Sequence, residues 1–560
     1  MFRFRCVILL VLAAAFCNAE VRRIRVIAPG INSEISRDAI AGFAARVEQR
    51  SGAKVVASGA APLTIRLRIQ PGIGTEGYEI RDTRRNQIEI AGNDERGLLY
   101  GLGRLLHTST YSSSGFAPGS WRGRSVPASQ VRGIYLACHF NNFYEVAPID
   151  EFQTYVEDLA FWGINSVALS FPSWQLDSLD EPAARKNIER IRLVMKRAKR
   201  AGLRVGLMGG NQVFRSAPRE LRNEPYPDDW GRRGTLGTNV CPSKPAGRAY
   251  LMAFWSRMFD EFRDPGLDYF TFWPYDEGGC GCKECWPWGA KGYPDLFRAI
   301  AGLARERWPA CKFILSTWMY DSPPAGEWVG LTQVLAADPR LTDYIMADAH
   351  EDFPRYPLEH GVPGGKPLLN FPEISMWGMS PWGGYGANPL PAHLQSLWNQ
   401  VSGAVAGGFP YSEGIYEDIN KAICSQFYWA PSQSARATVA AYAAAYFSPE
   451  VAQTVTEAVD ILEKNHKRSG RARFSGTPAS ARRAFELMTA ADARLTPQAR
   501  QSWRWRILYL RALIDDSLSR TNGKLRGAEL RQAFDELVRI YHAQNVHTNK
   551  VAPPAMEPGQ

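Results

Sequence analysis

Eight short apolar segments recur between residues 129 and 430, and stretches with helical spacing separate several of them. The helical stretches include Asp150–Trp162, Ala183–Ala201 and Pro294–Arg307. This alternation predicts an α/β fold, a parallel (β/α)8 TIM barrel, with an open doubly wound sheet as the alternative. The predicted strands are Val131–Cys138, Ser166–Ser170, Arg204–Met208, Tyr269–Tyr275, Lys312–Thr317, Tyr344–Ala347, Pro367–Phe371 and Ala404–Pro410.

The segment before the barrel, residues 20–122, is predicted to form a small α+β domain. Thr64–Ile69 alternates apolar and polar residues as a strand does. Gly77–Arg81 and Gln87–Ala91 flank a polar turn, which predicts a hairpin. Asn93-Asp94 then precedes five leucines at helical spacing, so we expect a helix that begins at this cap.

The remaining segments are assigned by composition. Ser112–Ser129 is rich in Ser, Gly and Pro and is predicted to be a linker into the barrel. Residues 431–546 are rich in Ala, Arg and Leu at helical spacing, which predicts a helical C-terminal domain. Residues 547–560 contain three prolines that would break any element, so we expect a disordered tail.

Composition narrows the class of protein. The chain has 560 residues, of which 45% are hydrophobic and 22% charged, and this excludes a disordered, collagen-like or coiled-coil chain. The net charge of +10 is spread along the chain without a long Lys/Arg block, so we expect no nucleic-acid partner. The 17 tryptophans fit either core packing or the lining of a sugar-binding cleft.

Residues 1–19 resemble a secretory signal peptide. Arg3 and Arg5 precede the apolar run Cys6–Phe16, which is too short for a membrane span, and Cys17-Asn18-Ala19 is a weak cleavage site. We therefore expect a secreted or periplasmic protein with a cleaved signal and no membrane span. Cleavage would leave seven cysteines, an odd number, so at least one thiol would be free or hold a metal.

One acidic pair stands out by its position. Asp-Glu occurs six times in the chain, but only Asp276-Glu277 directly follows a predicted strand, the fourth. Catalytic groups of a (β/α)8 barrel lie just past the carboxyl ends of its strands. Glycosidic cleavage needs an acid for the leaving oxygen, and adjacent carboxylates raise one another's pKa. We predict that Asp276 and Glu277 are catalytic; the alternative is a helix cap beside a solvated glutamate.

Other predicted strand ends carry aromatic rings, amides and acids. Rings stack on sugars, while amides and acids hold sugar hydroxyls, so this set predicts a sugar-binding cleft. The predicted substrate-binding residues are His139, Asn141, Trp174, Asn211, Trp273, Tyr275, Trp318, Tyr320, Asp348, Glu373, Trp377, Tyr411 and Glu413.

A cysteine cluster lies just beyond the acidic pair. Cys280, Cys282 and Cys285 follow Glu277 in a Cys-x-Cys-x-x-Cys pattern, and Cys241 would supply a fourth thiolate for a tetrahedral structural zinc. A disulfide from Cys241 to one of the other three is an equal alternative, and reduced thiols packed under a loop are a third. In each case the cluster would stiffen the loop that carries the acids, and no cofactor is expected for catalysis itself.

Two segments resemble known glycoside hydrolases. EGYEIRDTRRNQIEIAGNDERGLLYGLGRLL (Glu76–Leu106) resembles the small α/β domain that precedes the barrel in family 20 hexosaminidases and family 67 α-glucuronidases. RGIYLACHFNNFY (Arg132–Tyr144) and DLAFWGINSVAL (Asp158–Leu169) are similar to their first barrel strands. WPYDEGGCGCKEC resembles a segment of the family 163 endo-β-N-acetylglucosaminidases.

The family 20 resemblance implies roles for the acidic pair. Glu277 would be the general acid/base and Asp276 would orient the 2-acetamido group of the substrate, which itself attacks the anomeric carbon. Trp318 would close the acetamido pocket. The chain departs from family 20 in one respect: those enzymes usually have His-x-Gly-Gly before Asp-Glu, whereas here Trp273-Pro274-Tyr275 precedes the pair and Gly278-Gly279 follows it.

Three functions therefore remain open at the level of sequence. The first is a retaining β-N-acetylhexosaminidase that uses Asp276 and Glu277 on an oligosaccharide or polysaccharide. The second is an α-glucuronidase or another uronic-acid hydrolase, which the basic net charge slightly favours. The third is a non-catalytic glycan-binding protein on a hydrolase barrel.

Overall fold

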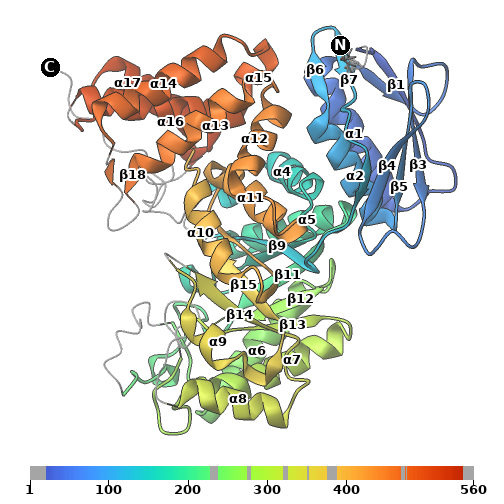
Figure 1. The fold of residues 1–560 in the computed structure, drawn as a ribbon. Coiled ribbons are helices and arrows are strands. Elements are labelled where there is room, and N and C mark those ends of the chain that lie inside the picture. The colour runs from blue at the N-terminus through green and yellow to red at the C-terminus, as the bar shows by residue number, and fades with distance from the viewer. Residues whose placement is uncertain are drawn as a thin grey trace, which may run out of the picture.

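The computed structural model describes residues 20–139, 141–227, 238–273, 279–318, 326–349, 352–374, 387–467, 473–474, 476–521 and 523–545. Three parts follow one another along the chain: an N-terminal sheet with two helices, a barrel, and C-terminal helices (Figure 1). The predicted signal peptide and the predicted tail lie outside the described residues. No described helix is long and apolar enough to cross a membrane.

The N-terminal part is a six-stranded sheet in the order β2-β1-β3-β5-β4-β8. The predicted hairpin is confirmed, because β4 and β5 pair antiparallel. The predicted helix is also confirmed, and the side chain of Asp94 caps it by accepting from the N–H of Gly97. The bounds are β1 (Arg23–Ile27), α1 (Glu34–Ser51), β2 (Lys54–Val56), β3 (Leu63–Ile69), β4 (Tyr78–Arg84), β5 (Gln87–Gly92), α2 (Glu95–Thr108) and β8 (Gly123–Ser125).

The prediction of a linker over Ser112–Ser129 is wrong. β6 (Thr110–Ser112) and β7 (Gly115–Ala117) form a hairpin, and β8 extends the main sheet beside β4. These strands have three residues each, which is too short for an alternating pattern to show in the sequence. The segment thus closes the N-terminal sheet before the chain enters the barrel.

The barrel has eight parallel strands, as predicted. β9 pairs with β10 on one side and with β16 and β17 on the other, which closes the sheet and rules out an open doubly wound arrangement. The strands are β9 (Val131–Leu136), β10 (Ser166–Ser170), β11 (Arg204–Gly209), β12 (Tyr269–Phe272), β13 (Lys312–Ser316), β14 (Tyr344–Ala349), β15 (Leu368–Pro372) and β16 (Val405–Gly408), which β17 (Tyr411–Ser412) continues.

A helix follows each strand of the barrel and covers its outside (Figure 1). The interior is filled by side chains from all eight strands, among them Tyr135, Met208 and Ile314. The described helices of the barrel are α3 (Phe143–Val146), α4 (Ile149–Phe161), α5 (Pro182–Arg200), α6 (Pro245–Glu261), α7 (Gly292–Arg307), α8 (Glu327–Ala337), α9 (Arg355–His360), α10 (Pro391–Val401) and α11 (Asp418–Trp429).

The C-terminal part is helical, as predicted, and packs beside α4 and α11 of the barrel (Figure 1). α13 packs on α14, and α16 lies between α14 and α17. The bounds are α12 (Ala435–Tyr446), α13 (Ala452–Lys464), α14 (Pro478–Asp492), α15 (Pro497–Gln501), α16 (Trp503–Arg520) and α17 (Ala528–Ile540).

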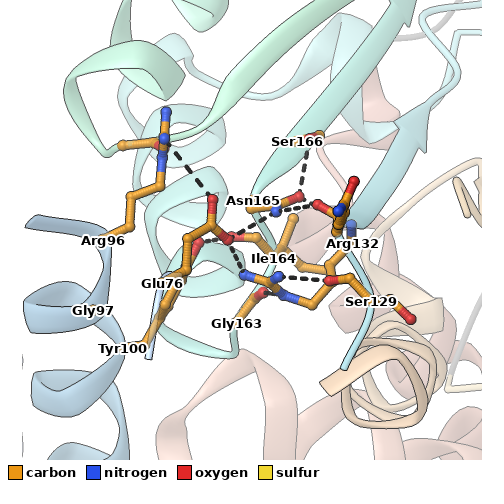
Figure 2. Close-up of polar contacts among 12 residues, drawn as sticks. Glu76, Arg96, Gly97, Tyr100, Ser129, Arg132, Gly163, Ile164, Asn165 and Ser166 are labelled. Atoms are coloured by element: carbon orange, nitrogen blue, oxygen red, sulfur yellow. Dashed lines mark hydrogen bonds and ion pairs between the residues drawn. The ribbon is translucent and has the colours of Figure 1, made fainter. Parts of the chain in front are cut away.

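A buried carboxylate joins the N-terminal part to the barrel. Figure 2 shows Glu76 facing Arg132 and Asn165, which lie at the amino ends of β9 and β10. One carboxylate oxygen accepts from Arg132 at 2.6 Å and from Asn165 at 3.0 Å, and the other lies 3.1 Å from Arg204. Burial raises the pKa of Glu76, but Arg132, Asn165 and Arg204 outweigh burial and leave this pKa below its ordinary value.

Candidate active site

The carboxyl ends of the barrel strands bring together predicted residues that lie far apart in the sequence. His139, after β9, contacts the hydroxyl of Tyr411 in β17 through Nε2 at 2.9 Å. The same hydroxyl donates to Oε1 of Glu413 at 2.7 Å. The Trp174 ring lies edge-on to His139, with the ring centroids 5.6 Å apart. The ends of the first, second and eighth strands thus form one connected group of polar and aromatic side chains.

Two buried groups support the turn that carries Glu413. The backbone N–H of Glu413 donates to the carboxylate of Glu417 at 3.1 Å, and Lys421 donates to the carbonyl of Gly414 at 2.6 Å. Burial raises the pKa of Glu417 to about 7, against the opposing effect of Lys421, and burial lowers the pKa of Lys421 to about 8. Glu417 and Lys421 are not among the predicted site residues, because their sequence pattern is that of an ordinary helix start.

Aromatic rings form the floor of this region. Tyr135, which is not among the predicted site residues, has its ring centroid 6.0 Å from that of Trp273 and 5.4 Å from that of Tyr411. Its hydroxyl donates to Ser170 Oγ at 2.7 Å. Trp318 packs against the same interior cluster. In the sequence, Tyr135 is marked only by its position in the predicted strand Val131–Cys138. A tyrosine that merely packs in the barrel interior would have the same position.

A pocket opens at the ends of β10, β11 and β12. Its cavity volume is about 30 Å³, and Trp174, Trp273 and Gln212 line it together with apolar side chains. Asn211 lies between two of the lining residues, Gly210 and Gln212. The side chain of Asn211 is 1% exposed, and neither polar atom of its amide has a hydrogen-bond partner among the described residues. A buried amide without partners is costly, so a ligand that satisfied it would gain affinity.

The remaining predicted residues divide into two groups. Asp348 lies in β14, and Glu373 follows β15; both are buried. The backbone of Glu373 forms an isolated parallel β-bridge with that of Tyr411. Asn141 has a left-handed backbone, with φ at 56°, and is half-buried. Asp276, Glu277, Tyr275, Tyr320 and Trp377 lie outside the described residues.

The four predicted cysteines do come together. Cys241, Cys280, Cys282 and Cys285 are all buried, and their sulfur atoms all lie within 4.8 Å of one another. None of the four forms a disulfide. The cluster could bind a metal ion, because four thiolates at this separation are a complete ligand set for a tetrahedral ion.

Comparisons with known proteins agree with the fold. No family model matches the chain, and no curated protein matches it. Among solved structures it is similar to a family GH115 4-O-methyl-α-glucuronidase with specificity for decorated arabinogalactans, at 12% identity and a TM-score of 0.61 over 93% of this chain and 76% of that one. It is also similar to a GH138 enzyme that targets pectin rhamnogalacturonan II, at 12% identity and a TM-score of 0.60 over 92% of this chain and 90% of that one.

The family 20 resemblance is likewise supported at the level of fold. The GH20 β-N-acetylhexosaminidase from Streptomyces coelicolor A3(2) matches at 12% identity and a TM-score of 0.52, over 76% of this chain and 91% of that one. The chain therefore has a fold like that of several glycoside hydrolases, with the polar strand ends described above at the mouth of the barrel.

Proposed function

We propose that this protein is a retaining glycoside hydrolase of the β-N-acetylhexosaminidase type, acting on an oligosaccharide or polysaccharide. The observation that carries the proposal is the group at the barrel mouth. Trp174, Trp273 and Gln212 line a narrow pocket, and Asn211, next to Gln212 in the chain, has a buried amide without a hydrogen-bond partner among the described residues. Flat rings stack on a pyranose, and an amide without partners in the described protein suits a hydroxyl or acetamido group.

The proposed chemistry rests on Asp276 and Glu277, which follow β12 in the sequence. Glu277 protonates the glycosidic oxygen while the acetamido oxygen of the substrate, oriented by Asp276, attacks the anomeric carbon. Glu277 then takes a proton from the water that opens the resulting ring, and the anomeric configuration is retained. This reaction needs no cofactor. We also infer from residues 1–19 that the protein is secreted or periplasmic.

A uronic-acid hydrolase is the second candidate, since the similarity to the GH115 α-glucuronidase covers 93% of the chain and that to the GH20 enzyme 76%. The local charge argues against it. In the first three positions after each barrel strand, the described residues include Glu373 and Glu413 but no Arg or Lys. A site that binds a carboxylate sugar would gain from a cation there.

The test compares Glu277→Gln with the wild type on aryl N-acetyl-β-glucosaminides and aryl α-glucuronides. Loss of the general acid should lower kcat/KM on the glucosaminide by about 100-fold or more. The loss of kcat should be smaller for a dinitrophenyl aglycone, which leaves without protonation. Glu95→Gln is the matched control, because it alters another Asp-Glu pair on α2, and it should keep full activity.

Other outcomes would select the alternatives. Full hydrolysis by Glu277→Gln would contradict the assigned acid. Turnover of the glucuronide alone would support the uronic-acid hydrolase. Tight oligosaccharide binding in a calorimeter without any product would support the non-catalytic glycan-binding protein.

A further inference from the structure

We propose that Cys241, Cys280, Cys282 and Cys285 bind one Zn²⁺ ion, and that this ion ties the loop after β11 to the loop after β12. The site would be structural, so the inference goes beyond the proposed hydrolase activity and does not depend on it.

The sulfur separations match a tetrahedral zinc site. Cys241 Sγ lies 3.8 Å from Cys282 Sγ and 3.9 Å from Cys285 Sγ. A tetrahedron with Zn–S bonds of about 2.3 Å has S···S edges of about 3.8 Å. A disulfide would need a separation of about 2.05 Å, so no pair of these sulfurs is in bonding range.

Hydrogen-bond donors surround the sulfurs, as they do in metal–thiolate sites. The backbone N–H of Glu224 points at Cys280 Sγ, with a distance of 3.3 Å. The hydroxyl of Ser243 lies 3.1 Å from Cys241 Sγ and 3.2 Å from Cys282 Sγ. Such donors stabilise negative sulfur and orient the ligands, and a neutral apolar core would not need them.

The local backbone fixes the spacing of two of the ligands. The N–H groups of Cys285 and Trp286 both donate to the carbonyl of Cys282, at 3.0 and 2.9 Å, which forms a tight turn between two of the cysteines. Zn²⁺ is preferred because a closed, buried set of four thiolates is typical of structural zinc, and because its binding needs no electron transfer. The thiols release their remaining protons to solvent when the ion binds.

The two tied loops both reach the candidate active site. On one side, Val240, next to Cys241, donates from its backbone N–H to the carbonyl of Asn211 at 3.1 Å. On the other side, Cys280 is three residues beyond Glu277 in the sequence. The side chain of Asn223 also donates to the carbonyl of Gly279 at 2.8 Å, joining the loops directly. Zinc would therefore restrain the loop that contacts Asn211 and the segment that directly follows the proposed catalytic pair.

The test begins with the metal content of the purified wild-type chain, measured by mass spectrometry. We expect one zinc per chain. Replacement by Co²⁺ should produce the visible absorption bands of a tetrahedral thiolate complex. After denaturation with a chelator, every cysteine should titrate as a free thiol. Less than about 0.2 metal per chain together with two missing thiols would overturn the proposal in favour of a disulfide, and stoichiometric iron would overturn the choice of zinc.

Variants then test the ligand set. The double variant Cys282→Ser/Cys285→Ser should lose the zinc, and its Tm should fall by about 5 °C or more. Cys311→Ala is the matched control, because this buried cysteine lies outside the cluster, and it should keep one zinc per chain. Zinc retained by the double variant would overturn the proposal. If that variant does not fold, the metal content and the free-thiol count of the wild type still test the zinc site. Neither measurement depends on whether the protein hydrolyses a glycoside.

Discussion

At the scale of single residues, glycines explain why the cysteine segment can form at all. A Cβ at Gly281 would lie 1.9 Å from the carbonyl oxygen of Pro225, and one at Gly279 would lie 1.9 Å from the ring of Trp288. Contacts that short do not occur, so each position admits only a hydrogen. The two glycines let the segment pack directly against backbone and a fully buried indole.

Gly281→Ala should therefore destabilise the protein. We expect the free energy of unfolding in urea to fall by about 1–3 kcal/mol, since the added methyl must push the backbone near Pro225 aside. Gly302→Ala in α7 is the control: its Cβ would meet nothing within 4 Å, so the helical position should be neutral or gain up to about 1 kcal/mol. Equal losses in the two variants would contradict this explanation.

At the scale of elements, Glu76 holds α2 and the amino ends of β9, β10 and β11 together. The guanidinium of Arg132 also donates to the carbonyls of Gly163 and Ser129, at 2.7 and 2.9 Å, and stacks on Tyr100 of α2, 5.3 Å from the ring centroid. Removing one partner of such a buried ion pair leaves the other charge uncompensated, which is far more costly than losing a surface pair.

Glu76→Gln should show this in its pH dependence. The folded-state pKa of Glu76 is lowered from 4.5, so the carboxylate adds stability above pH 4.5, and this contribution is lost as the pH falls through the folded-state pKa. At pH 7 the variant should lose about 3–5 kcal/mol of unfolding free energy. The gap between wild type and variant should narrow on acidification below pH 4.5.

The control for this experiment is Glu79→Gln. Glu79 lies in β4, three residues beyond Glu76, and its side chain is half-exposed. Its stability should follow that of the wild type at every pH. A Glu76→Gln deficit that stayed constant from neutral to acidic pH would show that the carboxylate contributes through packing alone and not through its charge.

At the scale of the whole molecule, one buried ionic network contacts all three parts. Arg504 of α16 donates to Asp158 of α4 at 2.8 Å and to Asp418 of α11 at 2.7 Å. Asp158 also accepts from Arg46 of α1 at 2.6 Å. Burial raises the pKa of Asp158, but Arg46 and Arg504 outweigh burial and hold this pKa below its ordinary value. The three parts are therefore coupled in stability.

Arg504→Ala should weaken that coupling. Asp418 loses its pairing with Arg504, and Asp158 keeps only Arg46. We therefore expect a loss of about 3–5 kcal/mol in urea unfolding, with faster protease cleavage within the C-terminal helices. Arg504→Lys should not restore the stability, because an ammonium cannot reproduce the two directed bonds. Arg494→Ala removes an exposed pair with Glu450 and should change stability by less than about 1 kcal/mol. Similar losses for Arg504→Ala and Arg494→Ala would contradict the coupling.

The elements themselves could be predicted because their signals are local. An apolar run encodes a strand such as β10, and an acidic cap followed by spaced leucines encodes α2, within a few residues of sequence. The three-residue strands β7 and β8 could not be predicted, because so few residues carry no period. The position of Asp276 and Glu277 after the fourth strand can likewise be read from the local sequence. Their catalytic roles stay a prediction.

Local patterns in the amino-acid sequence are enough to predict the eight strands and the helices between them, and they give the spacing of the cysteines. Three contacts appear only in the folded chain: β9 pairs with β16 to close the barrel, His139 meets Tyr411, and Cys241 joins the three later cysteines. These contacts join residues 39 to 276 positions apart. Side chains that far apart in the chain leave no periodic trace, because their meeting depends on how the closed barrel places its loops.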